Sequence, residues 1–254
     1  MIMASSISRK RLIGIASIEF LIGLVAKLPA ATALNWFLPA DIETRGISGT
    51  LCQCKMDALK VKGTAIGPLA WARKPAALIT GRLAADIEAG LPGGFFDGHV
   101  SAGRDVLELN DARVAVTLAP ITRLSPIGPS EGLLQATIVT ARFETMWPVA
   151  VDGNVILRDL VYPPVGRTPL GSFSLDFDPA MERPADYAVS GQLSSLEGPF
   201  DLDGELFLGD QRAYSLRAEI AAKADADQAI RNALRLLGPA DASGKQRLVF
   251  DGNL

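Results

Sequence analysis

The pentapeptide GPSEG at residues 128–132 matches the G-x-S-x-G pattern, in which the serine, here Ser130, is a nucleophile. That chemistry requires a strand before the serine, a helix after it and a histidine later in the chain. Pro126 and Pro129 interrupt the approach to Ser130, and a run rich in β-formers follows it. His99 is the only histidine and precedes the serine. The pattern therefore predicts a turn and not a hydrolase site.

Cys52 and Cys54 are the only cysteines, and with His99 they could supply three metal ligands. Zinc sites in proteins usually close with a second pair of ligands, which this sequence lacks. Residues i and i+2 of a strand share one face, so we interpret the two cysteines as small apolar residues of that face, with a redox or metal role as the alternative. Phosphate-loop, dinucleotide and zinc-protease motifs are missing from the sequence. We therefore expect no catalytic, cofactor-binding or metal-binding residues, no cofactor and no enzymatic activity.

Charge and composition argue against a nucleic-acid-binding protein. The 254 residues carry a formal net charge of -3, and Lys and Arg do not cluster beyond residue 11. The 24 glycines and 16 prolines suit a fold of many short strands joined by turns.

The first 40 residues predict a membrane anchor. A basic cluster at residues 9–11 precedes an apolar run over 12–26 and a milder one over 28–38. Together the runs are long enough to cross a bilayer, which takes about 20 helical residues. The basic cluster should stay in the cytoplasm, and Trp36 and Phe37 should lie at the outer interface. These features predict a single-pass membrane protein with a cytoplasmic tail (1–11), a transmembrane anchor (12–34) and a β-domain (35–254) on the other side of the membrane.

A cleaved signal peptide is the main alternative to this anchor, because a basic and then apolar N-terminus fits both. Glu19 interrupts the apolar run, and an ionisable residue inside a membrane is a functional hypothesis by default. Glu19 therefore either contacts the transmembrane helix of a partner, or is protonated in the bilayer or reaches water through a local defect.

Alternation with a period of two dominates the chain after residue 48 and predicts half-buried strands. The clearest examples are at residues 79–88, 172–178, 201–208, 214–220 and 247–254, with less regular strands at 106–118, 133–143 and 149–160. Short turns, without long helical crossovers, separate these segments, so the sheet should be largely antiparallel. We therefore predict a mostly β fold, in which an N-terminal transmembrane helix precedes a curved sheet.

One α-helix is expected late in the chain, from about Asp225 to Leu237. Asp225 and Gln228 resemble a capping box, and Gly238 and Pro239 end the pattern. The apolar stripe of this helix should cover one end of the sheet.

The apolar face of the sheet must be buried against something. Two stacked sheets, a closed barrel or a curved sheet folded over itself would each bury it. Because predicted helices are scarce, a sheet that covers its own apolar face is favoured.

Several short segments resemble the type II secretion system protein N (GspN-like) family. They are LPAA at residues 28–31, GISGTL at 46–51, LAW at 69–71 with the downstream Pro75 and Leu78, LEGPFDLDG at 196–204, and the final LVFDGNL at 248–254. The resemblance runs in order along most of the chain. It departs from the family after residue 51, where CQC replaces a tryptophan and a small residue.

This resemblance implies an inner-membrane protein with a periplasmic β-domain. It implies an accessory, non-catalytic role in the export of folded proteins across the outer membrane. The partners that it implies are other inner-membrane or periplasmic components of the secretion system. The oligomeric state is left open.

A second interpretation is an AsmA-like periplasmic β-groove that binds or conveys membrane lipid. An apolar face left accessible would suit acyl chains, whereas one sealed by side chains would be only a core. Large aromatic residues such as Phe173, Phe177 and Phe200 fit either case.

Overall fold

The computed structural model describes residues 29–31, 42–50, 52–61, 64–73, 82–91, 93–122, 130–162, 169–235 and 238–253. None of the helices within these ranges is long and apolar enough to cross a membrane. The predicted anchor at residues 12–34 lies almost entirely outside the described residues. Of the turn predicted at residues 128–132, residues 128 and 129 lie outside them, whereas Glu131 and Gly132 belong to a strand.

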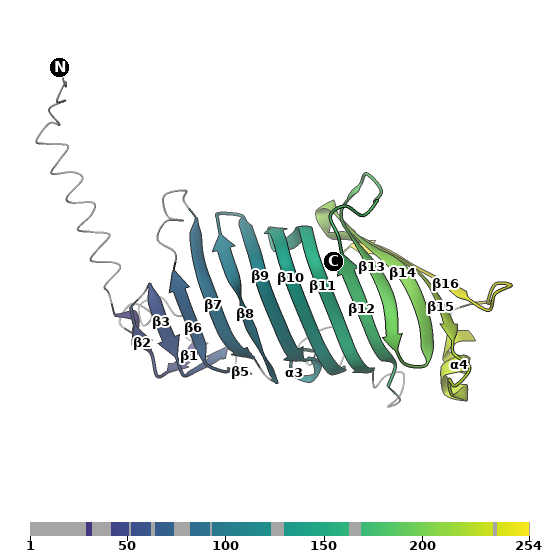
Figure 1. Ribbon diagram of the computed structural model, residues 1–254, viewed down its shortest axis with the longest axis horizontal. Coiled ribbons are helices and arrows are strands. Elements are labelled where there is room, and N and C mark those ends of the chain that lie inside the picture. Colours follow the sequence, from purple (N-terminus) through teal and green to yellow (C-terminus); the bar gives the residue numbers. More distant parts are fainter. Residues whose placement is uncertain are drawn as a thin grey trace, which may run out of the picture.

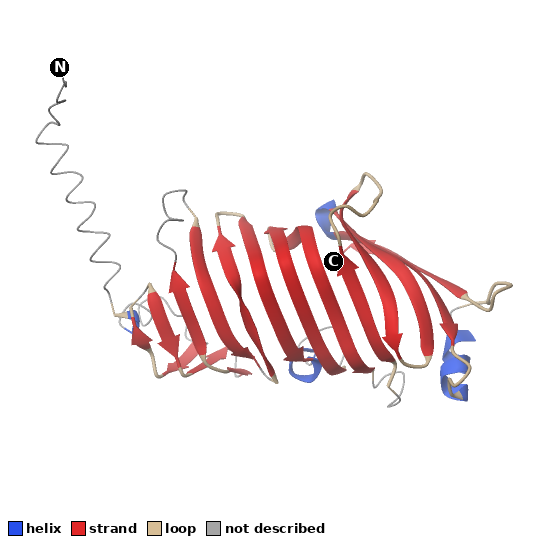
Figure 2. Ribbon diagram, viewed as in Figure 1, coloured by secondary structure: helices blue, strands red, loops and turns tan. Residues whose placement is uncertain are grey.

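A single sheet of thirteen antiparallel strands makes up most of the described chain (Figures 1 and 2). The prediction of a mostly β, largely antiparallel fold is thereby confirmed. From β6 to β16 the strands follow one another in chain order, because short connections place each strand beside its predecessor. The strands of this sheet are β2 (Ser48–Gly49), β3 (Gln53–Met56), β6 (Leu69–Arg73), β7 (Leu83–Leu91), β8 (Gly94–Ala102), β9 (Val106–Thr117), β10 (Glu131–Glu144), β11 (Trp147–Val161), β12 (Gly171–Phe177), β13 (Tyr187–Glu197), β14 (Phe200–Gly209), β15 (Ala213–Ala222) and β16 (Gln246–Asn253).

A small second sheet lies at the N-terminal end of the large one. It contains β1 (Ile42–Arg45), β4 (Ala58–Val61) and β5 (Thr64–Ile66), in the order β1-β4-β5. Two short α-helices are α3 (Leu118–Thr122), between β9 and β10, and α4 (Gln228–Arg235), between β15 and β16. A single 3-10 turn, η2 (Asp210–Arg212), joins β14 to β15.

Helix α4 confirms the predicted late helix but is capped by a different residue. The Ile230 backbone N–H donates a hydrogen bond of 2.8 Å to a carboxylate oxygen of Asp227. Asp227 is therefore the N-cap, because a capping side chain accepts from a backbone N–H two or three residues later. The prediction of a cap at Asp225 was wrong by two residues.

The sheet bends at its C-terminal end, where β13 to β16 are turned relative to β7 to β11 (Figure 1). Strand β12 is much shorter than its neighbour β11. The first part of β11 can therefore approach β14 directly, and the indole N–H of Trp147 donates a hydrogen bond of 2.8 Å to the carbonyl oxygen of Gly209. This contact links strands that are three positions apart in the sheet order.

Candidate functional site: the apolar face of the sheet

Every strand of the large sheet from β3 to β16 contributes one residue to a continuous row, which we call the apolar row. Directly opposed residues of antiparallel strands point to the same side of a sheet, so the strand register defines the row. Its members in sheet order are Met56, Leu69, Ala89, Phe96, Val114, Ala136, Val155, Leu175, Leu193, Gly204, Ala218 and Leu248. Neighbouring strands lie about 4.8 Å apart, so the row is roughly 50 Å long.

The residues next to these, alternately one position after and one position before them, form a row on the opposite face, and most of them are polar. Its members from β6 to β15 are Ala70, Glu88, Asp97, Arg113, Thr137, Asn154, Asp176, Gln192, Glu205 and Arg217. Neighbours in this row pair with one another: Arg113 forms an ion pair with Asp97 at 2.5 Å, and the Asn154 amide donates to Asp176. These contacts are made between neighbouring strands of the sheet.

The ends of the apolar face are covered by other parts of the chain. At the N-terminal end, Ala30 packs with Cys54 and Met56, and Leu69 and Trp71 lie against this cluster. At the C-terminal end, α4 lies against the face, and a second cluster forms there from Phe200, Ile220, Ala226, Ile230 and Leu234. The predicted role of the late helix, to cover one end of the sheet, is thus confirmed.

Between these two clusters the large apolar side chains of the row stay half-buried. Phe96, Val114, Val155 and Leu175 are examples. The residues of this stretch that are fully buried are mostly small, such as Ala112 and Ala141. The structure therefore differs from the expected sheet that covers its own apolar face. A meander with short connections supplies no second layer, because each new strand extends the same sheet.

An open apolar face of this length can bind a hydrophobic partner. Soluble monomers rarely expose apolar patches larger than a few hundred Å², and larger patches mark contacts with proteins, membranes or apolar ligands. The chemistry that the face offers is burial of apolar surface, worth about 25 cal/mol per Å² removed from water. Bond-making chemistry would need polar groups, which this face does not present along the apolar row.

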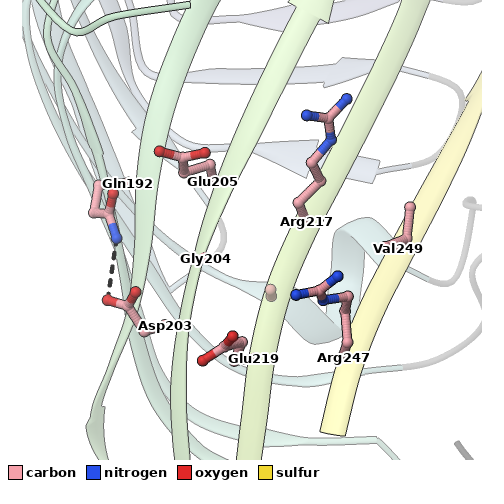
Figure 3. A pocket seen from close by; sticks show the side chains of 9 residues that line it. Gln192, Asp203, Gly204, Glu205, Arg217, Glu219, Arg247 and Val249 are labelled. Atoms are coloured by element: carbon pink, nitrogen blue, oxygen red, sulfur yellow. Dashed lines mark hydrogen bonds between the residues drawn. The ribbon is translucent and has the colours of Figure 1, made fainter.

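Two hollows of the described chain lie over the polar face. One, of about 550 Å³, spans β13 to β16 and is surrounded by polar and charged side chains, including Asp203, Glu205, Arg217, Glu219 and Arg247 (Figure 3). Within it the Gln192 amide donates a hydrogen bond of 3.1 Å to Asp203. The other, of about 570 Å³, spans β3 to β9 and has charged residues of four strands around it. Apolar residues such as Pro68 and Phe95 also line the second hollow.

The candidate nucleophile Ser130 lies outside any catalytic arrangement of the kind that its motif requires. Helix α3 precedes it and strand β10 follows it, which is the reverse of the strand–serine–helix order of a nucleophile elbow. Its backbone N–H donates a hydrogen bond of 2.9 Å to the Thr122 hydroxyl. His99 lies on the polar face, where its Nδ1 is 2.6 Å from an Asp86 carboxylate oxygen.

The cysteines have the environment expected of apolar residues on one face. Cys54 is 1% exposed and belongs to the N-terminal cluster, whereas Cys52 is half-buried, and both thiols are free. Burial raises the pKa of the Cys54 thiol above its ordinary value, which favours the unreactive protonated form. In the described part of the chain, no group of three or more His, Cys, Asp and Glu side chains is placed to hold a metal ion.

Comparisons with known proteins identify a family and a relative of this chain. A family model described as Type II secretion system (T2SS), protein N matches residues 40–249. The type II secretion system protein N of Vibrio cholerae serotype O1 (strain ATCC 39315 / El Tor Inaba N16961) is 24% identical over 259 residues, which cover 96% of this chain and 100% of that relative. No solved structure matches the chain.

Proposed function

Because this chain belongs to the type II secretion system protein N family, we propose that it is a non-catalytic accessory component that supports the export of folded proteins across the outer membrane. In this proposal residues 12–34 hold it in the inner membrane as a single-pass anchor, with the N-terminus in the cytoplasm and the β-domain in the periplasm. The basic cluster at residues 9–11 supports this orientation.

The observation that carries the proposal is the open stretch of the apolar face between the two end clusters. A face of this kind is stable in water only at a cost, and a partner that covers it removes that cost. We propose that another inner-membrane or periplasmic component of the secretion system covers this stretch.

A pair of neighbouring residues on β10 provides a matched test. Ala136 belongs to the apolar row between Val114 and Val155, whereas Thr137 is exposed on the polar face beside Arg113. Ala136→Asp places a carboxylate in the path of any apolar partner. Thr137→Asp places the same group where water and a guanidinium stabilise it.

The amount of protein secreted by cells that carry only one of these variants then shows whether the apolar face is needed for export. We expect Ala136→Asp to impair export of the secreted proteins and Thr137→Asp to leave it at the normal level. Both variants should accumulate in the membrane fraction to the same amount. Normal export with both variants would show that the apolar face has no role in secretion.

Lipid is a second candidate occupant of the same stretch, favoured by its length. The apolar row is roughly 50 Å long, whereas the hydrocarbon core of a whole bilayer is about 30 Å thick. Acyl chains could therefore lie along the face without leaving it. Native mass spectrometry of the full-length protein, released from membranes in a mild detergent, tests this candidate. Bound phospholipid that is lost in Ala136→Asp and kept in Thr137→Asp would favour lipid over a protein partner.

The proposed topology has its own test. A reporter enzyme that is active only outside the cytoplasm, fused after Leu254, should be active. The full-length protein should stay with the membranes after a carbonate wash. A mature protein that begins near Leu34 and is released by the wash would indicate a cleaved signal peptide instead.

A further inference from the structure

The two edges of the large sheet are very different. At the N-terminal edge β2 has only two residues, and the adjacent Thr50 is bridged to Pro29. At the C-terminal edge β16 has eight residues, and one side of it has no strand partner in the described chain. Natural sheets shorten or cover their edge strands because a free edge pairs readily with another strand. Among the described residues, only the first edge is protected in this way.

Strand β16 also presents unpaired side chains. Val249 is 52% exposed on the polar face, and Phe250 is 51% exposed on the apolar face. The side chains of Arg247 and Asp251 are exposed and make no hydrogen bond or ion pair with other described residues. Glu219, which lies opposite Arg247 on β15, already pairs with Lys245 at 3.2 Å. The edge therefore offers both a cation and an anion.

We propose that β16 pairs with β16 of a second copy of this chain, antiparallel and around a two-fold axis at Val249. In this register Arg247 of each copy lies opposite Asp251 of the other, which gives two ion pairs on the polar face. Leu248 of each copy lies opposite Phe250 of the other on the apolar face. The two Val249 side chains meet at the axis.

Charge and face alignment select this register among its neighbours. A slip by one residue would place the apolar face of one copy beside the polar face of the other. Moving the two-fold axis by one residue shifts the pairing by two residues, so the faces stay aligned. An axis at Leu248 would then leave Arg247 opposite Val249, and an axis at Phe250 would leave it opposite Asn253. An axis at Arg247 or Asp251 would place like charges opposite each other, which is destabilising.

The pairing would bring the apolar faces of the two sheets together beside the clusters that the two α4 helices cover. Leu248 is the last member of the apolar row, so its contact with Phe250 of the second copy joins the apolar faces of the two sheets. The arrangement is closed, because the same edge is used by both copies and no free β16 remains. It does not depend on whether a protein or lipid covers the apolar face.

Cysteine cross-linking of the full-length protein in membranes tests the axis. Opposed residues of antiparallel strands have Cα atoms about 4.5–5.5 Å apart, within the range of about 4.4–6.8 Å that a disulfide allows. Val249→Cys should therefore form a disulfide-linked dimer on mild oxidation. Arg217→Cys is the matched control: Arg217 lies opposite Val249 on β15, so its two copies would be three strand spacings, about 14 Å, apart. It should stay monomeric, as should the wild type with Cys52 and Cys54 alone.

Charge reversal tests the register. Asp251→Arg, added to Val249→Cys, places an arginine opposite Arg247 at both symmetry-related positions of the dimer. The repulsion should abolish the cross-linked dimer. Adding Arg247→Asp as well recreates both ion pairs with the charges exchanged and should restore it. The proposal is overturned if Val249→Cys stays monomeric, if it cross-links to a different protein, or if Asp251→Arg leaves the dimer unchanged.

Discussion

Two alanine substitutions on the same face of β15 would measure which part of the apolar face is covered. Ile220 is 8% exposed and packs in the cluster that α4 closes. Leu216 lies four residues earlier, opposite Leu206 and Phe250, in the half-buried part of the face. Both changes, Ile220→Ala and Leu216→Ala, remove the same number of carbon atoms. A difference in their cost therefore reports on the surroundings and not on the chemistry.

The expected costs differ severalfold. Ile220→Ala leaves a cavity under α4 and should lower the free energy of unfolding by about 2–5 kcal/mol, as buried isoleucine-to-alanine changes do. Leu216→Ala leaves no closed cavity, since water already reaches the side chain. Full burial of a leucine is worth about 1.5–3 kcal/mol, so a partial loss of about 1 kcal/mol is expected. Typical domains are stable by about 5–15 kcal/mol, and only the first change would remove a large fraction.

Urea unfolding followed by tryptophan fluorescence would provide the two values. A chain that begins at residue 28 keeps Ala30, which belongs to the N-terminal cluster. The midpoint should fall much further for Ile220→Ala than for Leu216→Ala, with an unchanged slope. Equal losses would mean that the face is covered as fully at Leu216 as under α4. That result would refute the interpretation that the apolar face is open, on which the proposed function rests.

Two further predictions concern polar contacts at the C-terminal end of the sheet. Trp147→Phe removes the indole N–H that bonds to the Gly209 carbonyl, and should cost about 1 kcal/mol in the same urea assay; no loss would mean that the bend of the sheet does not depend on this bond. Hydrogen bonds from the Ser243 hydroxyl and the Lys245 backbone N–H lower the pKa of Asp241 below its ordinary value. The stability from a lowered carboxyl pKa is present above the unfolded value, about 3.9, and is lost as pH falls through the folded value. Urea midpoints of wild type and Asp241→Asn should therefore differ at neutral pH and converge at acidic pH, whereas a constant difference would contradict this role.

Strand periodicity was enough to predict the fold class. Alternation such as that around Phe173 and Leu175 is set by the geometry of an extended chain, which sends successive side chains to opposite faces. Helix α4 was predictable for a similar reason, since its apolar stripe and the glycine and proline after it are local signals. The cap at Asp227 was missed because two aspartates, Asp225 and Asp227, precede the helix, and the sequence does not say which one turns back onto the backbone.

The tertiary structure was needed to establish the register between strands and to show that the described residues form no second layer over the middle of the sheet. Alternation within β10 says that Ala136 and Thr137 face opposite ways, but it does not say that Val114 and Val155 flank Ala136. Burial also depends on what lies above a face: Ile220 and Leu216 follow the same pattern, and only α4 makes one a core residue and leaves the other half-buried. The free edge at β16 and the contact from Trp147 to Gly209 are likewise relations between distant segments. A local pattern specifies which side of a strand is apolar, whereas the path of the whole chain decides whether anything covers that side.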